Sequence, residues 1–215
     1  PLHKRGYKRQ TGKAPLRETT AALFLRHAGF DGVEPVVDPM CGSGTFVIEA
    51  AEQALGLLPG RSRGFAFQDM ASFDPERFEA LRRQTPEQPI TEPRFFGSDR
   101  DDGAIRGALA NAERAGVCDG VRFSRHAISD LQRPDGPPGL IVTNPPYGAR
   151  IGNRKLLFAL YGAFGQVLRE RFAGWRVAFV TSDGGLAKAT GLPLRAGPPV
   201  PNGGLQVKLY TGTLS

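Results

Sequence analysis

Short β-type runs alternate with helical patterns along most of the chain, and this alternation constrains the fold more than any other feature. Helical patterns cover residues 44–58, 101–115 and 155–172. Strands separated by helices form parallel sheets that are covered on both faces. We therefore expect an α/β fold with a Rossmann-like, mostly parallel sheet. The predicted strands are residues 35–40, 94–99, 121–127, 139–144, 176–182 and 205–210.

The 215 residues suit one domain, since no repeat or linker divides them. Residues 1–22 are predicted to form a basic N-terminal extension and the first helix. Residues 59–93 fit the alternation poorly, so we expect an inserted excursion with one short helix near 75–83. Glycine and proline are concentrated in 192–204, which is predicted to be a turn between the last two strands.

A glycine-rich turn follows the first predicted strand in the segment VVDPMCGSGTF, residues 36–46. Gly42 and Gly44 allow a sharp turn and close approach to a ligand, and the next helix offers free N–H groups. A P-loop would need a lysine after Gly44, and a dinucleotide fingerprint would need glycine at Val47. An adenosyl cofactor with a terminal amino acid fits better, because Asp38 can face its ammonium group. The alternative is that Asp38 only caps the turn.

The next two strands end in residues suited to the rest of such a cofactor. Asp99 ends the second strand, where a carboxylate can accept hydrogen bonds from both ribose hydroxyls. Asp101 and Asp102 are predicted to begin the following helix. His126, at the end of the third strand, could contact adenine, although a histidine in such a place is often without a special role.

The tetrapeptide Asn144-Pro145-Pro146-Tyr147 follows the fourth strand and is the strongest chemical signal in the chain. An amine on an aromatic ring is a poor nucleophile because its lone pair is delocalised. The Asn144 side-chain carbonyl and the Pro145 main-chain carbonyl can both accept hydrogen bonds from such an NH₂ group and aim its lone pair. Tyr147 offers a face on which an extruded base can stack. The alternative is that the tetrapeptide is only a Pro-Pro turn that leaves the strand, without a role in catalysis.

Basic residues are concentrated at the start of a chain whose net charge is +7. Residues 1–17 hold six lysines and arginines and no acid, against 22 basic and 21 acidic residues elsewhere. Such a segment can attract a phosphate backbone, or it can be a solvated terminus. The residues that we expect to bind RNA are Lys4, Arg5, Lys8, Arg9 and Arg150.

Composition narrows the class of protein further. Cys41 and Cys118 are too few for a disulfide scaffold and lack metal-ligand spacing, so no metal site is expected. No run is long and apolar enough for a membrane span, and we expect a cytoplasmic protein. The chain opens with Pro1 rather than methionine, as a piece of a longer protein would.

The motifs PLHKRGYK, APLRETTAA, DPMCGSGTF, TNPPYG, GW and NGGL together resemble the catalytic domain of THUMP-containing RNA guanine-N2 methyltransferases, with bacterial large-subunit rRNA enzymes as the nearest relatives. The resemblance covers essentially the whole chain. It implies a class I, S-adenosylmethionine-dependent methyltransferase with a seven-stranded sheet that has one antiparallel strand. It also implies an RNA partner, namely rRNA, and an upstream THUMP domain that these residues do not contain.

By this similarity, Pro15, Leu16, Glu18 and Thr19 flank the methionine end of the cofactor, the turn after Asp38 holds its amino-acid part, and Asp99 holds ribose. The expected cofactor-binding residues are Pro15, Leu16, Glu18, Thr19, Asp38, Pro39, Cys41, Gly42, Ser43, Gly44, Thr45, Asp99, Arg100, His126, Ala127 and Asn144. The expected catalytic residues are Asn144, Pro145, Pro146 and Tyr147. Relatives usually carry an acid at His126 and a tryptophan near Gln68-Asp69-Met70, where this chain has neither.

Three other functions stay open at this point. The same tetrapeptide serves methylation of adenine N6 in DNA and of glutamine in proteins. An RNA-binding module without catalysis is a third reading, although Asp38, Asp99 and Asn144 are present. A nicotinamide-dependent Rossmann enzyme is disfavoured by Val47.

Overall fold

Within the residues that the computed structural model describes (4–9, 16–83, 92–148 and 153–215), seven strands form one sheet in the order β3-β2-β1-β4-β5-β7-β6. The strands are β1 (Val36–Asp38), β2 (Phe95–Asp99), β3 (Val121–Arg125), β4 (Leu140–Thr143), β5 (Arg176–Thr181), β6 (Arg195–Asn202) and β7 (Leu205–Thr213). Strands β1 to β5 run parallel, and β7 is antiparallel to both β5 and β6. This is the class I methyltransferase sheet that the sequence predicted.

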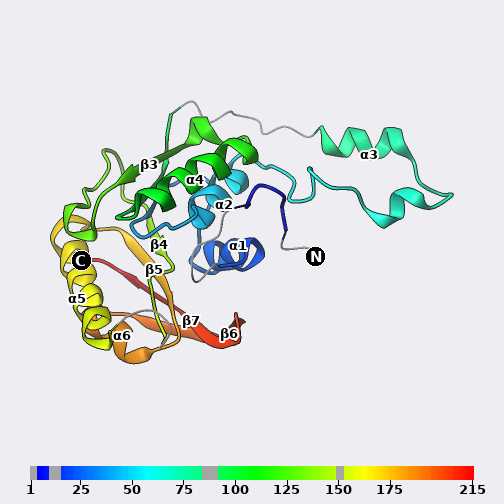
Figure 1. Ribbon diagram of the computed structural model, residues 1–215. Helices are drawn as coiled ribbons and strands as arrows, with labels where there is room; N and C mark the ends of the chain where they lie inside the picture. The colour runs from blue at the N-terminus through cyan, green and yellow to red at the C-terminus, as the bar shows by residue number, and fades with distance from the viewer. Residues whose placement is uncertain (1–3, 10–15, 84–91, 149–152) are drawn as a thin grey trace.

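Helices cover both faces of this sheet (Figure 1). They are α1 (Glu18–His27), α2 (Thr45–Ala54), α3 (Pro75–Arg82), α4 (Asp102–Ala115), α5 (Arg154–Arg171) and α6 (Gly184–Ala189), with short 3-10 turns at Ala66–Asp69, Cys118–Gly120 and Ile128–Asp130. The helices α1, α2 and α4 lie on one side, and α5 and α6 lie on the other. No described helix is long and apolar enough to cross a bilayer.

The sheet core is apolar because the central strands are buried on both faces. All residues of β4 are buried, as are all but the first of β5. Close packing also explains a glycine in the middle of α5. A Cβ atom added to Gly165 would lie 1.8 Å from the Thr190 carbonyl oxygen, so only glycine lets α5 approach the end of α6 this closely.

Strand β6 lies where the sequence predicted only a turn. The segment contains Pro198, Pro199 and Pro201, which argue against a central strand because proline has no N–H to donate. β6 is instead the edge strand of the sheet, and its register shifts between Ala196 and Pro199. The predicted turn is confined to Gly203 and Gly204, both with positive φ. The short helix α6 was also missing from the prediction.

The excursion after α2 has a small aromatic cluster of its own. Phe65 stacks on Phe67 with ring centroids 5.2 Å apart, and both rings meet Phe78 edge to face. Pro75 begins α3, and Asp74 caps it by accepting a hydrogen bond from the Arg77 amide. Figure 1 shows α3 projecting away from the sheet. The short helix predicted near 75–83 corresponds to α3, within the described part of this segment, residues 59–83 and 92–93.

Candidate active site

The candidate site lies beside β1, at the point of the sheet where the strands β2 and β3 lie on one side and β4 and β5 on the other. β1 pairs with β2 on one side and with β4 on the other, so the carboxyl ends of all three strands meet. Crevices at such points bind ligands in open α/β sheets. Asp38 ends β1, Asp99 ends β2 and Asn144 follows β4. The fold therefore brings together three residues that the sequence analysis assigned to one site.

The turn from Cys41 to Thr45 has the shape that its glycines predicted. Gly44 has φ +79°, and its amide donates to the Cys41 carbonyl at 2.8 Å. A Cβ atom at Gly44 would lie 2.9 Å from the Phe123 ring. Gly42 also has positive φ, but no atom lies within 4 Å of the place that its Cβ would occupy. The space beside the Gly42 backbone is therefore free for a ligand.

Three contacts from other elements hold this turn. The Gly42 amide donates to Asp99 Oδ2 at 3.1 Å, and the Cys41 amide donates to the Ser98 carbonyl at 2.9 Å. Asn111 is fully buried in α4, and its Nδ2 donates to the Ser43 carbonyl at 3.0 Å. Asp99 and Asn111 thus fix the turn against β2 and α4.

Asp38 is a buried carboxylate at the bottom of the site, 2% exposed. Its pKa is raised to about 7, chiefly by burial and also by the charge of nearby Asp99, although hydrogen bonding with Thr143 and the Met40 amide opposes the rise. A ligand ammonium beside Asp38 would stabilise the charged form. The neighbouring Cys41 thiol has a raised pKa, chiefly because it is buried, so it is not primed as a nucleophile.

The tetrapeptide leaves β4 beside this carboxylate. Asn144 and Pro146 are partly exposed, and Pro145 is buried. Tyr147 is only 5% exposed, and Asn202 Nδ2 donates to its hydroxyl at 3.1 Å. The open stacking face expected for Tyr147 is therefore not what the structure shows, because the β6–β7 hairpin, which the sequence analysis missed, reaches this ring.

The remaining predicted cofactor residues differ in their degrees of burial. Leu16, Glu18 and Pro39 are buried, whereas Thr19 and Arg100 are exposed. The His126 amide donates to the Asp99 carbonyl at 3.1 Å, which places His126 beside Asp99. Ala127 follows it and is partly buried. Pro15 and Arg150 lie outside the described residues.

The basic segment at the start of the chain makes structural contacts that were not expected. Arg5 pairs with Glu49 through two hydrogen bonds, at 2.6 and 2.8 Å, and its side chain is 8% exposed. Lys8 Nζ donates to the Leu16 carbonyl at 2.6 Å, and burial lowers its pKa. Two of the four predicted RNA-binding residues here are thus held by the protein itself, while Lys4 and Arg9 are exposed.

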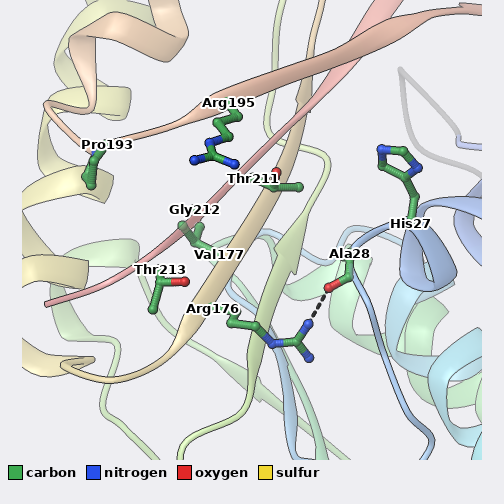
Figure 2. Close-up of a pocket in the computed structure, with 9 residues that line it drawn as sticks. All are labelled: His27, Ala28, Arg176, Val177, Pro193, Arg195, Thr211, Gly212 and Thr213. Carbon is green, nitrogen blue, oxygen red and sulfur yellow. Dashed lines mark hydrogen bonds between the residues drawn. The ribbon is translucent and has the colours of Figure 1, made fainter.

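A cavity of about 520 Å³ lies at the opposite edge of the sheet (Figure 2). It is lined by the end of α1, the starts of β5 and β6 and the end of β7. Arg176 points across it to the Ala28 carbonyl and also pairs with Glu34. These contacts fasten α1 to β5, and the cavity is far along the strands from Asp38 and Asn144.

Several residues of the site were missed by the sequence analysis. Asn111, Thr143 and Asn202 contact the turn, Asp38 and Tyr147 respectively. A polar residue among the alanines of the buried face of α4 was the only available signal for Asn111. In the described part of the chain, no group of three potential metal ligands is found.

Comparison with known proteins agrees with this geometry. Residues 5–196 match the family described as "RMKL-like, methyltransferase domain". The ribosomal RNA large subunit methyltransferase K/L of Vibrio campbellii is 40% identical over 85% of this chain and 27% of its own length. The protein of the same name from Chromohalobacter salexigens is 38% identical over 97% of this chain and 30% of its own.

Solved structures share the fold over the whole chain. The structure of SMU.472 complexed with SAH has a TM-score of 0.87 and 29% identity, and it covers 100% of this chain and 56% of that one. A methylase structure from Clostridium difficile has a TM-score of 0.88 and 30% identity with the same coverage. This chain thus spans only about a third of the named K/L relatives and about half of the solved chains. It belongs to the family of RMKL-like methyltransferase domains.

Proposed function

We propose that this domain transfers a methyl group from S-adenosylmethionine to the exocyclic N2 amine of a guanine in RNA, and that the RNA is ribosomal. The observation that carries the proposal is the position of Asn144 to Tyr147 directly after β4, next to the strand that ends in Asp38. An amine-binding loop and a cofactor-binding carboxylate then lie side by side. The K/L names of the relatives support rRNA as the acceptor. Such a function places the protein in the cytoplasm.

The described residues suit this cofactor. The free space beside Gly42 would admit the amino-acid part, the buried Asp38 would pair with its ammonium group, and Asp99 would accept hydrogen bonds from ribose. S-adenosylmethionine supplies an electrophilic methyl group when bound. Proximity and alignment then provide most of the acceleration, with no covalent enzyme intermediate.

Asn144 and the Pro145 carbonyl would orient the target NH₂ by accepting its two hydrogens. The nitrogen lone pair would then be aimed at the methyl group that the cofactor supplies when bound, and the extra proton of the methylated amine would leave to solvent. Pro145 suits this role because proline has a fixed φ and no N–H that would repel the amine hydrogens. A paired guanine must leave its stack to reach this site.

The test is transfer of labelled methyl from S-adenosylmethionine to unmodified total RNA, genomic DNA and cell protein in parallel, followed by nucleoside and amino-acid analysis. We expect N2-methylguanosine in rRNA. A DNA arm is needed because one similar structure, from Listeria monocytogenes, is named as a predicted N6-adenine-specific DNA methylase. N6-methyladenine in DNA or methylglutamine in protein would replace the proposed acceptor. Loss of both cofactor binding and label in every arm would favour the RNA-binding module without catalysis.

A further inference from the structure

A second cavity, of about 290 Å³, is lined by four arginines from three parts of the chain. Arg5 and Arg9 come from the N-terminal segment, Arg61 from the start of the excursion and Arg114 from the end of α4. None of the described residues that line this cavity is acidic. We name it the arginine cavity. Its guanidinium groups offer N–H donors to an anion, and Arg9 and Arg114 carry charges that no ion pair of the described residues neutralises.

Three of the four arginines, Arg5, Arg61 and Arg114, are held in place by the protein before any ligand arrives. Glu49 binds Arg5 from the buried side, and Glu52 binds Arg61 at 2.5 Å. Arg114 Nε donates to the Tyr7 carbonyl at 2.7 Å. Little side-chain entropy is therefore lost when an anion binds to these guanidinium groups.

Donors are still available for a ligand. Arg5 binds Glu49 through Nε and Nη2, and Arg114 binds the Tyr7 carbonyl through Nε. Because a guanidinium group has five N–H donors, these bonds leave other donors of both side chains for a ligand. Within the described part of the chain, the Arg9 guanidinium makes no hydrogen bond or ion pair, and its side chain is exposed. Arg9 is thus the arginine that can turn toward an incoming anion.

We propose that the arginine cavity binds a backbone phosphate of the RNA substrate, which rests on the proposed function. Arginine is well suited to phosphate because its planar fork can bind two oxygens at once. The site adds Arg61 and Arg114 to the N-terminal basic residues and gives Arg5 a supporting role, since Glu49 already holds it. Lys8 does not line the cavity, and its ammonium group donates a hydrogen bond to the Leu16 carbonyl.

The arginine cavity is one side chain away from the cofactor turn. Asn111 Oδ1 accepts hydrogen bonds from Arg114 and, at 3.4 Å, from the Arg9 amide. The same side chain donates to the Ser43 carbonyl through Nδ2. An RNA strand held in this cavity is therefore fixed at a set distance from the methyl donor, as a substrate that must deliver one base requires.

The experiment measures binding of a short single-stranded RNA to the whole chain at 50 to 250 mM KCl, by fluorescence anisotropy. The variants are Arg9→Ala and Arg9→Glu, which keep the hydrogen bond from the backbone amide of residue 9 to Asn111. Arg122→Ala, at an exposed arginine on β3, is the matched control. We expect Arg9→Ala to weaken binding about tenfold at 50 mM and to reduce the slope of log K against log salt by about 0.7. Arg9→Glu should weaken binding more, and Arg122→Ala should change the slope less than either.

Unchanged affinity and slope in both Arg9 variants would overturn the proposal. Inorganic phosphate, titrated in parallel, identifies the kind of anion. If it binds the wild type but not Arg9→Glu while RNA affinity is the same in both, the cavity is a small-anion site and the proposal fails. Failure of the proposed methyl transfer can be distinguished from failure of the arginine cavity, because RNA affinity and its salt slope are measured without cofactor. Methyl transfer to RNA with an unchanged slope would leave the proposed function standing and remove only the arginine cavity.

Discussion

The Gly42 amide donates a hydrogen bond to the Asp99 carboxylate at 3.1 Å, across 57 positions of sequence. One carboxylate oxygen thereby holds the glycine turn, and the other accepts the Asp101 amide at 3.0 Å. A residue assigned to ribose binding is also part of the support of the turn. Cofactor affinity and turn geometry should therefore change together when Asp99 is altered.

Replacing Asp99 by alanine should raise the Kd for S-adenosylhomocysteine at least about tenfold, because the variant loses charge-assisted hydrogen bonds worth about 1.5–3 kcal/mol. Isothermal titration calorimetry measures this directly. Asp101→Ala is the matched control, since Asp101 caps α4 by accepting the Ala104 amide. That variant should lose about 1 kcal/mol of stability and keep its affinity. Equal affinity in Asp99→Ala and the wild type would remove Asp99 from the site.

Cofactor affinity should rise with pH because Asp38 has a pKa of about 7, against an ordinary 3.8. Below pH 7 the carboxyl is mostly neutral and cannot pair with an ammonium group. We expect S-adenosylhomocysteine to bind at least about tenfold more tightly at pH 7.5 than at pH 5.5. 5′-Methylthioadenosine lacks the amino acid and is the matched control ligand, with little pH dependence. A similar slope for both ligands would contradict the role of Asp38.

The same shift has a consequence for stability without cofactor. Because the folded pKa lies above the unfolded value, the folded state holds a proton that the unfolded state releases between about pH 4 and pH 7. The contribution of Asp38 to the free energy of unfolding is therefore present below pH 4 and lost by about pH 7. Urea denaturation of wild type and Asp38→Asn should show the wild type losing up to about 4 kcal/mol relative to the variant over this range. A constant difference would show that the pKa is not raised.

Asn144→Ala should abolish methyl transfer while sparing the cofactor. The alanine cannot accept a hydrogen bond from the target amine, so alignment is lost, and we expect kcat to fall by about 10² or more. The Kd for S-adenosylhomocysteine should stay within about twofold. Single-turnover transfer with a fixed RNA gives the rate. Near-normal turnover in Asn144→Ala would refute the assignment of the tetrapeptide.

The hydrogen bond between Asn202 and Tyr147 should matter for the target base rather than for the cofactor. Asn202→Ala and Tyr147→Phe each remove it, from opposite sides. Each should lower kcat/KM for RNA by about three- to tenfold, and the double variant should be no worse than the single ones, since both act through one contact. Gln206→Ala, exposed on the same hairpin, is the control. Additive losses would show that the two residues act independently.

The buried pair of Arg5 and Glu49 should stabilise the fold. Arg5→Ala leaves the Glu49 carboxylate buried without its partner, and we expect a loss of about 3–5 kcal/mol at pH 8. Burial raises the Glu49 pKa to about 7, so the loss should be smaller at pH 5.5, where the carboxyl is protonated. The double variant Arg5→Met/Glu49→Gln should recover much of the loss. Urea denaturation at both pH values tests this, and equal losses would argue against an ionised pair.

The positions of six strands along the chain could be predicted because each is a local signal: an apolar run, then a turn residue, then a helical pattern. Their ends could not, and β1 is shorter than the predicted 35–40. Strand β6 was missed since its prolines read as a turn, and only its place at the edge of the sheet makes them acceptable.

In the candidate site, too, local features could be predicted and contacts across the fold could not. Asp38, Gly42 and Gly44 belong to one continuous motif, so their proximity follows from local sequence. Asn111 and Asn202 act across the fold, on residues 68 and 55 positions away. Pairing at such separations depends on the sheet order and on how far each helix is rotated, which one sequence does not specify. The sequence shows that Arg5 is charged, but its burial against Glu49 depends on tertiary packing that the sequence does not specify.

The aromatic cluster of Phe65, Phe67, Phe73 and Phe78 is separate from the main core. A segment that carries its own small core can change in length or composition without altering the register of β1 against β2. Differences among members of the family should therefore accumulate between α2 and β2, while the strand ends that hold Asp38 and Asp99 keep their places. For protein engineering, this excursion is the natural position at which to insert a reporter or graft a foreign binding loop.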